Sequence, residues 1–342
     1  MKPREIILSA FEGGKPERVP ATLFGAGMWS IKDYGSSFQE LGADPRRMSD
    51  MLVKESERLL CDVVYAGSGY NNFHASAFGG NIKYREMGAP DLEEHLVDSA
   101  EALKDFDLSA LDRSEVINNV KEALKIAKDK LGDEYVVTLT AWGPFTLAGR
   151  FLGEEPMMKA TFKKPDLVHG VVDFCADLLI HLYEPLVDDG TLQVISLADP
   201  TASGDLISKK QFKDFAVPYL GKFTQWAKSK NVHTLVHICG NTTDRVEVMP
   251  DTGASCISLD HKTDMVKAKE TLHGKMCFAG NVDPVAVMLQ GTPEQVEATC
   301  KGIIEKVGTD GGFVLMPGCD IPPTVPYENI QKFIRTAREW KL

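Results

Sequence analysis

Apolar, β-branched runs recur along the chain, and most of them end at Gly, Asp or Pro. Short runs of this composition, bounded by turn residues, are typical of buried strands. We therefore predict eight strands: Val19–Phe24, Cys61–Ala66, Tyr135–Ala141, Gln193–Ala198, His233–Cys239, Ser255–Asp260, Lys275–Ala279 and Gly312–Met316. Helical periodicity fills most of the intervals, at Glu115–Leu131, Asp166–Leu186, Lys209–Lys230, Pro293–Val307 and Tyr327–Trp340.

This alternation of strands and helices predicts parallel pairing through right-handed crossovers. Eight such units build a (β/α)8 TIM barrel, and a chain of 342 residues is long enough for one. We predict an α/β fold, with one barrel domain over residues 1–342 and an N-terminal extension before the first strand. The widest interval, Gly67–Glu134, follows the second strand and predicts an insertion over the barrel mouth.

Composition restricts the possible environment and partners of the chain. Its hydrophobic content of 43% and charged content of 25% are ordinary for a soluble enzyme. No apolar run approaches the roughly 20 residues of a membrane span, and the charged start does not resemble a secretory signal. Seven irregularly spaced cysteines and a net charge of -11 favour a reducing cytoplasm and argue against nucleic acid as a partner.

The pair His237 and Cys239 carries the clearest chemical signal. The two residues lie two positions apart in a predicted strand, so their side chains project from the same face. Cys319 follows another apolar run and also lies at a strand end. One imidazole and two thiols with a fourth position left open are typical of a catalytic zinc site. Spacing alone leaves a second interpretation open, in which these cysteines are small buried hydrophobic residues.

The other five cysteines, Cys61, Cys175, Cys256, Cys277 and Cys300, lie in apolar strand-like or helix-like runs, and we expect them to be core residues.

Three acidic residues end predicted strands or follow them directly. They are Asp199, Asp260 and Asp320, the last of which is adjacent to Cys319. Strand C-termini build the active site of a barrel of this type, so each acid is a candidate catalytic group. Each could instead be a helix cap or a solvated loop residue.

The motifs as a set resemble the uroporphyrinogen decarboxylase superfamily, and within it the zinc-dependent corrinoid methyltransferases. The resemblance extends over nearly the whole chain, and its most specific part is His-x-Cys with a distant Cys. The segments that carry it are Pro16–Pro20, Gly143–Ala148, Asp199–Ser203, His237–Thr242, Ser258–Asp260, Gly280–Pro284 and Pro317–Cys319.

The resemblance implies that His237, Cys239 and Cys319 hold zinc. It also implies methyl transfer between a corrinoid (cobalamin) on a separate protein and a small zinc-bound molecule. That molecule is a thiol such as coenzyme M, or a methyl ether or other methylated donor. The sequence contains no D-x-H-x-x-G corrinoid-binding motif, which agrees with a separate carrier.

The chain departs from the methyltransferase pattern after its last cysteine, where Asp320 replaces a common glycine. This carboxylate could be a fourth ligand, a proton donor or a substrate contact. The alternative function is a decarboxylase acting on porphyrinogens. That branch uses arginines soon after the first strand, whereas residues 21–44 contain none.

Overall fold

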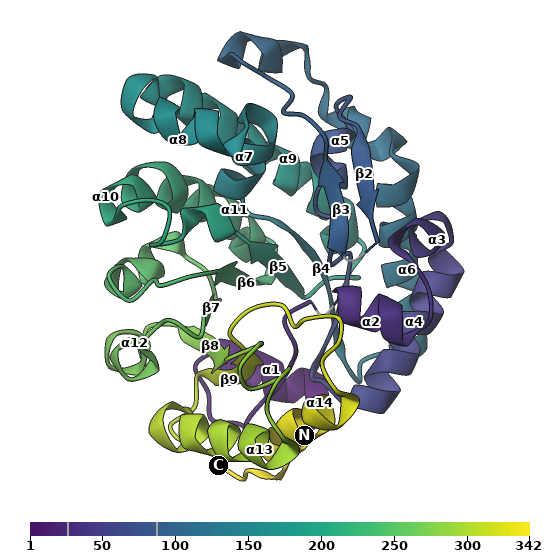
Figure 1. The fold of residues 1–342 in the computed structure, drawn as a ribbon, viewed down its shortest axis with the longest axis vertical. Coiled ribbons are helices and arrows are strands. Elements are labelled where there is room, and N and C mark those ends of the chain that lie inside the picture. Colours follow the sequence, from purple (N-terminus) through teal and green to yellow (C-terminus); the bar gives the residue numbers. More distant parts are fainter. Residues whose placement is uncertain (26, 87) are drawn as a thin grey trace.

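The centre of the molecule is a curled sheet of seven parallel strands (Figure 1). The computed structural model describes residues 1–25, 27–86 and 88–342. Along the sheet the strands follow one another as β1 (Val63–Ala66), β4 (Val136–Trp142), β5 (Val194–Ala198), β6 (His233–Ile238), β7 (Cys256–Leu259), β8 (Cys277–Val282) and β9 (Phe313–Pro317). Seven of the eight predicted strands are therefore confirmed, in the predicted order and with parallel pairing.

The first predicted strand, Val19–Phe24, is not a regular strand, and that part of the prediction was wrong. The segment forms a single parallel bridge from Ala21 to Leu315 of β9. On its other side the Ala21 carbonyl accepts a hydrogen bond from the amide of Asp62, just before β1. Pro20 has no N–H, and the Asp62 carboxylate takes the amide of Ala21, so a second ladder cannot form. The segment nevertheless lies between β9 and β1, where a barrel would close.

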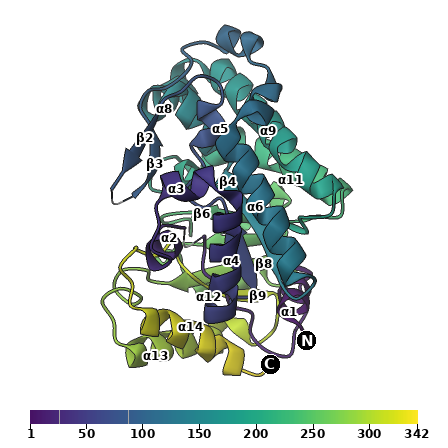
Figure 2. The ribbon, with the colours of Figure 1, turned by 90° about the vertical axis from the view of Figure 1, so that its right-hand side faces the viewer.

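Helices surround the sheet on its outside (Figures 1 and 2). The predicted helix Glu115–Leu131 has the expected bounds, and the other predicted helices agree within a few residues. Two predicted helices each contain a π-helical turn, at Phe212–Ala216 and Ile304–Gly308. The α-helices are α1 (Pro3–Phe11), α2 (Gly27–Asp33), α3 (Phe38–Ala43), α4 (Pro45–Leu59), α5 (Phe73–Ser76), α6 (Glu115–Leu131), α7 (Pro144–Leu152), α8 (Glu154–Lys163), α9 (Pro165–Asp188), α10 (Lys209–Gln211), α11 (Val217–Ser229), α12 (Met265–Leu272), α13 (Pro293–Ile303) and α14 (Tyr327–Glu339).

The predicted insertion contains α5, an antiparallel hairpin and two short 3-10 helices before α6. The hairpin strands are β2 (Ile82–Arg85) and β3 (Gly88–Leu92). Asn72 joins the hairpin to the barrel, because its amide nitrogen donates to the Pro90 carbonyl at 3.0 Å and its oxygen accepts from Trp142 Nε1 at 2.8 Å. Trp142 is the last residue of β4, so the insertion lies at the mouth as predicted.

The inner face of the sheet and helix α1 form an apolar core. Ile7, Ala10 and Phe11 of α1 belong to one apolar cluster with inward-facing residues of the strands. The strand residues of this core are Val63, Tyr65, Val136, Val194, Ala198, Leu235, Cys256, Cys277, Ala279, Val314 and Met316. Helix α1 thereby closes the N-terminal end of the barrel. The opposite end, where the strands finish, is left for a functional site.

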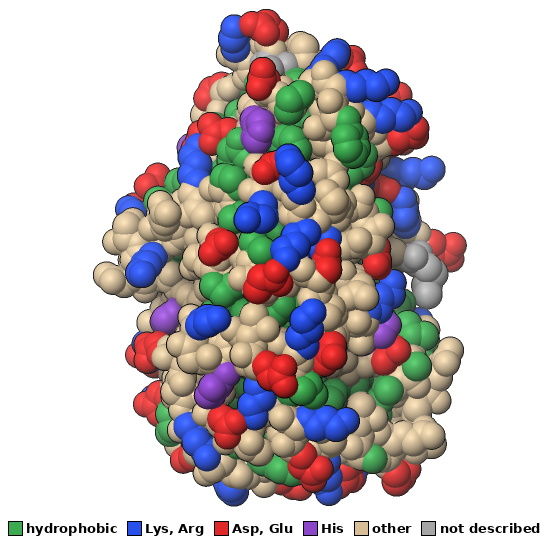
Figure 3. Space-filling view, turned by 90° about the vertical axis from the view of Figure 1, so that its left-hand side faces the viewer, with side chains coloured by type: hydrophobic (Ala, Val, Ile, Leu, Met, Phe, Trp, Pro, Cys, Tyr) green, Lys and Arg blue, Asp and Glu red, His purple; other side chains and the backbone are tan. Residues whose placement is uncertain are grey.

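The surface carries intermixed charges. On the face drawn in Figure 3, basic and acidic side chains alternate over the described residues without a large area of one sign. Among those residues, no helix has both the length and the apolar character that a membrane crossing requires.

Candidate metal centre

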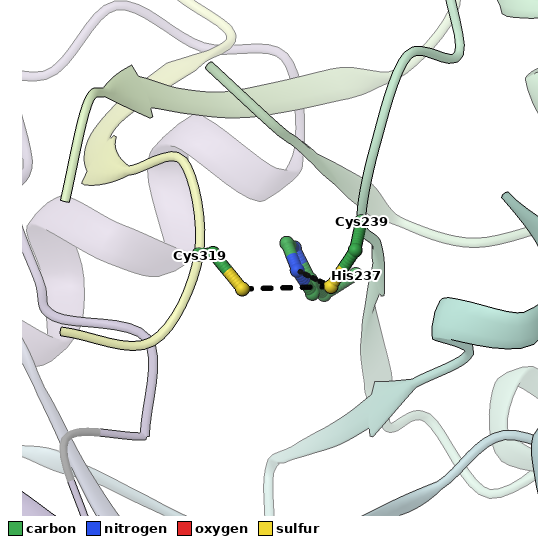
Figure 4. A group of neighbouring side chains, drawn as sticks. All are labelled: His237, Cys239 and Cys319. Atoms are coloured by element: carbon green, nitrogen blue, oxygen red, sulfur yellow. Dashed lines mark hydrogen bonds between the residues drawn. The ribbon is translucent and has the colours of Figure 1, made fainter. Parts of the chain in front are cut away.

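Three potential metal ligands meet where two strands end. His237 is the penultimate residue of β6, Cys239 follows that strand directly, and Cys319 lies two residues after β9. His237 Nε2 is 3.1 Å from Cys239 Sγ, which is 3.5 Å from Cys319 Sγ (Figure 4). One ligand atom from each residue lies within 4.8 Å of the others. The structure thus brings together the three residues that the sequence singled out, although they come from strands that are not neighbours.

The His237 ring is held by contacts on its edge and on its face. Its Nδ1 lies 3.0 Å from the hydroxyl of Ser258, the residue paired with it in β7. The ring of Phe24 covers it, with centroids 4.4 Å apart. With a proton on Nδ1 donated to Ser258, the lone pair of Nε2 is directed at the two sulfurs.

These distances fit a tetrahedral metal ion. With Zn–S bonds of about 2.3 Å, two thiolate ligands of one zinc lie about 3.8 Å apart. A disulfide would need a separation of about 2.05 Å. The donor set of one imidazole nitrogen and two sulfurs is also the set that zinc prefers.

The two sulfurs differ in how tightly they hold a proton. The hydrogen bond with Cys239 lowers the pKa of the Cys319 thiol to about 4. The same contact, together with burial, raises the pKa of Cys239. The pair therefore gives up its first proton readily and retains the second, until a cation replaces it.

Asp260 lies beside the ligands and accepts hydrogen bonds from the loops around it. Its Oδ2 accepts from the amide of Gly240, the residue after Cys239, at 2.9 Å. Its Oδ1 accepts from the amide of Lys262 at 3.0 Å and lies 2.9 Å from Nδ1 of His261. The carboxylate is buried, and its contacts fix the turn that carries Cys239.

Asp199 is fully buried and faces helix α7. Its Oδ1 accepts from the amide and the hydroxyl of Thr146, at 2.7 and 2.6 Å. Its Oδ2 has no hydrogen-bond partner among the described residues. Burial raises the pKa of this carboxyl to about 6. These contacts give Asp199 a capping function at the start of α7, and catalysis by it stays a prediction.

Asp320 is exposed at the mouth, directly after Cys319. Its Oδ1 accepts a hydrogen bond from the amide of Ile321 at 3.0 Å. Its charge contributes to the raised pKa of Cys239, so it lies within electrostatic reach of the ligands. The group of mutually close ligand atoms found among the described residues has three members, and Asp320 is not one of them.

Two features of the site were missed in the sequence. Ser258 lies in a segment that carries the family resemblance, but its contact with His237 depends on strand register. Gly318 packs so closely on the loop after β7 that an added Cβ would lie 2.3 Å from the amide nitrogen of His261. A glycine directly before a ligand cysteine was the available signal for this close approach.

The remaining five cysteines are buried, as expected for core residues: Cys61, Cys175, Cys256, Cys277 and Cys300.

Comparison with known proteins places this chain in a family. A family model described as uroporphyrinogen decarboxylase (URO-D) matches residues 2–340. The methylcobamide:CoM methyltransferase MtbA of Methanosarcina mazei is 31% identical over 99% of this chain and 98% of its own length. A uroporphyrinogen decarboxylase of Synechococcus sp. is 30% identical over 97% of this chain and 96% of its own.

A solved structure, described as a methyltransferase from Methanosarcina mazei, has the same fold over the full length. It aligns with a TM-score of 0.88 and 27% identity, and 99% of each chain is covered. The chain therefore belongs to the uroporphyrinogen decarboxylase family, and within it to the methyltransferase branch.

Proposed function

We propose that this protein is a zinc-dependent methyltransferase that moves a methyl group between a corrinoid on a separate protein and a small zinc-bound substrate. The observation that carries the proposal is the convergence of His237, Cys239 and Cys319 at the barrel mouth, with their ligand atoms within 4.8 Å of one another. Three protein ligands leave a tetrahedral ion one position for a substrate.

His237, Cys239 and Cys319 would hold the metal. When bound, zinc would lower the pKa of a substrate thiol or act as a Lewis acid on the heteroatom that leaves a methyl group. Ser258 keeps the Nε2 lone pair of His237 directed at the sulfurs, and Phe24 shields the imidazole from water. Cys239 and Cys319 are both partly exposed residues, so a substrate could approach them from the mouth.

Asp320, Asp260 and Asp199 are the candidate catalytic acids. Asp320 is best placed to touch a substrate, because it is exposed and directly follows Cys319. It would donate a proton to a departing oxygen or contact the substrate. Loss of transfer in Asp320→Asn, with zinc content retained, would support this role. The same test on Asp199→Asn would separate catalysis from capping.

The proposed partner is a corrinoid protein. Support comes from the curated relatives, among them MtbA of Methanosarcina mazei and MtaA of Methanosarcina barkeri, both named methylcobamide:CoM methyltransferases. The sequence has no D-x-H-x-x-G segment of its own to bind the corrinoid. A small thiol such as coenzyme M, or a methyl ether or other methylated donor, would occupy the fourth position on the metal.

A decarboxylase acting on porphyrinogens is the second candidate, favoured by the 30% identity to the Synechococcus enzyme. Such a substrate carries many carboxylates and needs accessible cations. Arg18, close to the start of the barrel, is buried and forms two hydrogen bonds with Asp62, at 2.9 and 2.5 Å, so it is not available to a substrate. This pairing weighs against the decarboxylase.

The test combines metal analysis with the absorbance of methylcobalamin. We expect about one zinc per chain, and conversion of methylcobalamin to the Co(I) form when a suitable thiol is added. Methylation of Co(I) cobalamin by an ether or alcohol alone would instead assign the demethylating direction. Cys319→Ala should lose both zinc and transfer. Absence of zinc and of cobalt chemistry, with loss of CO2 from a porphyrinogen, would establish the decarboxylase.

A further inference from the structure

The end of strand β7 touches all three segments that carry the metal ligands. Ser258 contacts His237, and Asp260 accepts from Gly240, the residue after Cys239. The next residue, His261, lies against Gly318, which precedes Cys319. Ser258, Asp260 and His261 are not members of the group of potential metal ligands.

Ser258 controls the orientation of an imidazole that has two similar nitrogens. The serine is fully buried and is the register partner of His237, so strand pairing fixes its hydroxyl beside Nδ1. A partner at Nδ1 selects the tautomer in which Nε2 is free to bind a metal, and it prevents the ring from turning. Loss of this hydroxyl would leave a buried N–H without a partner and the ring less constrained.

Asp260 controls the turn after Cys239. Gly240 has a left-handed backbone conformation, with φ of 75°, and its amide points at Asp260 Oδ2. A Cβ on Gly240 would lie 2.3 Å from the hydroxyl of Ser203, so the turn has little freedom in that direction. The carboxylate thereby fixes the direction in which the preceding residue, Cys239, presents its sulfur.

The alternation of the two strands explains why one neighbour can serve both ligands. His237 and Cys239 lie two residues apart, and so do Ser258 and Asp260 on the adjacent strand. His237 and Ser258 are paired in the strand register, and Cys239 and Asp260 directly follow the two strands, so the supporting groups and the ligands leave the sheet side by side.

We propose that Ser258 and Asp260 are positioning residues of the metal centre, which orient His237 and Cys239 and thereby set its affinity and coordination geometry for zinc. This inference rests on the proposed function, because it assumes that the three ligands hold a metal. In this role both residues act through the ligands, since Ser258 contacts His237 and Asp260 contacts the residue after Cys239. Partners of this kind typically change metal affinity about 10- to 100-fold when they are removed.

The test measures zinc affinity by competition with a chromophoric chelator, together with the absorption spectrum of the cobalt(II)-substituted protein. Neither readout uses a corrinoid or a methyl donor. We expect Ser258→Ala to bind zinc about 10- to 100-fold more weakly and to change the ligand-field bands of cobalt. Ser258→Thr, which keeps the hydroxyl and suits a strand, should restore most of both.

Ser196→Ala is the matched control. Ser196 is a fully buried serine of β5, between Val194 and Ala198 of the inner core, and its hydroxyl has no hydrogen-bond partner among the described residues. Like Ser258→Ala, Ser196→Ala removes a serine hydroxyl from the inside of the barrel, but this hydroxyl contacts no ligand, so zinc affinity and the cobalt spectrum should stay unchanged. An equal loss in Ser196→Ala and Ser258→Ala would show a general effect of the barrel interior and would overturn the proposal.

Asp260→Asn and Asp260→Ala test the second residue. The amide retains an oxygen for the Gly240 amide, so we expect the asparagine variant to bind zinc more tightly than the alanine variant. Wild-type affinity and spectrum in Ser258→Ala and Asp260→Ala would overturn the positioning role and leave the proposed function intact. A wild-type protein that binds neither zinc nor cobalt(II) would overturn both.

Discussion

Two pairs of cysteines in this barrel show how position decides chemistry. Cys239 and Cys319 lie at the mouth, beyond the ends of β6 and β9. Cys256 and Cys277 are register partners at the starts of β7 and β8. The first pair is partly exposed, whereas the second pair is fully buried. The residue type is the same in both pairs, so any difference in their chemistry comes from their surroundings.

Those surroundings act on the proton of each thiol. In the inner pair, burial raises the pKa of Cys256 far above its ordinary value, so it stays a neutral thiol. At the mouth, the hydrogen bond with Cys239 lowers the pKa of Cys319 to about 4, and His237 Nε2 lies 3.1 Å from Cys239. A metal needs thiolates and an imidazole, and only a partly exposed strand end with a histidine offers both.

Removal of one cysteine from each pair should affect different properties, zinc binding at the mouth and stability in the interior, and this is the largest contrast we predict. Cys319→Ala should reduce bound zinc from about one per chain to nearly none, because two ligands hold zinc poorly. Cys277→Ala should keep the zinc and lose about 1–2 kcal/mol of unfolding free energy through a small cavity. Metal analysis and urea unfolding measure the two effects. Equal zinc loss in both variants would contradict the contrast.

Alkylation of the metal-free protein should separate the pairs by rate. We expect iodoacetamide to modify the mouth pair, beginning with Cys319, at least about 100-fold faster than Cys256 and Cys277, which are shielded from solvent. Peptide mass spectrometry identifies the modified residues. Added zinc should protect the mouth pair. Modification of all four at similar rates would mean that the barrel interior opens readily.

Gly318→Ala should disturb the mouth without removing a ligand. The new Cβ would lie 2.3 Å from the backbone nitrogen of His261, so the loop with Cys319 must move. We expect zinc affinity to fall about 10- to 100-fold, as for other changes that misplace a ligand. Gly302→Ala is the control, since its Cβ meets nothing within 4 Å and alanine favours a helix. Unchanged affinity in Gly318→Ala would show that the loop adapts.

Asp199 and Asp320 also differ as a buried and an exposed group, and we expect a smaller effect from their substitution than from that of the cysteines. Burial raises the pKa of Asp199 to about 6. Because this lies above the ordinary value near 4, its favourable contribution is complete below about pH 4 and is lost as the pH rises through 6. Asp199→Asn should therefore gain up to about 3 kcal/mol over the wild type at pH 8, relative to pH 4.

Urea unfolding at the two pH values measures this difference, with Asp320→Asn as the exposed control. A gain for Asp199→Asn that is the same at both pH values would show that the buried carboxyl does not titrate in this range.

Most of the fold was predictable from the sequence because strands buried on both faces read as continuous apolar runs. The exception, Val19–Phe24, reads the same way but makes only one bridge to β9. A tertiary contact prevents this segment from forming a regular strand: the Asp62 carboxylate accepts a hydrogen bond from the amide of Ala21, 41 positions away in the sequence. The hairpin Ile82–Leu92 was also missed, because its exposed first strand has no apolar pattern.

The candidate site was predictable in part. The spacing of His237 and Cys239 places both on one strand face, a local property that sequence carries. That Cys319 joins them depends on how the sheet curls, since β6 and β9 are separated by two strands. Periodicity does not predict that Cys319 lies close to His237 and Cys239, whereas the family resemblance implied that all three hold one metal. The contact of Ser258 with His237 depends on register between strands, which no single segment determines.

The most direct test of the central claim is X-ray absorption at the zinc edge of the purified wild-type protein. The account predicts one zinc with two sulfur ligands at about 2.3 Å and a histidine nitrogen at about 2.0 Å. A light atom or a thiol sulfur should fill the fourth position, and an added substrate thiol should raise the sulfur count to three. Zinc bound only by nitrogen and oxygen, or no zinc at all, would contradict it.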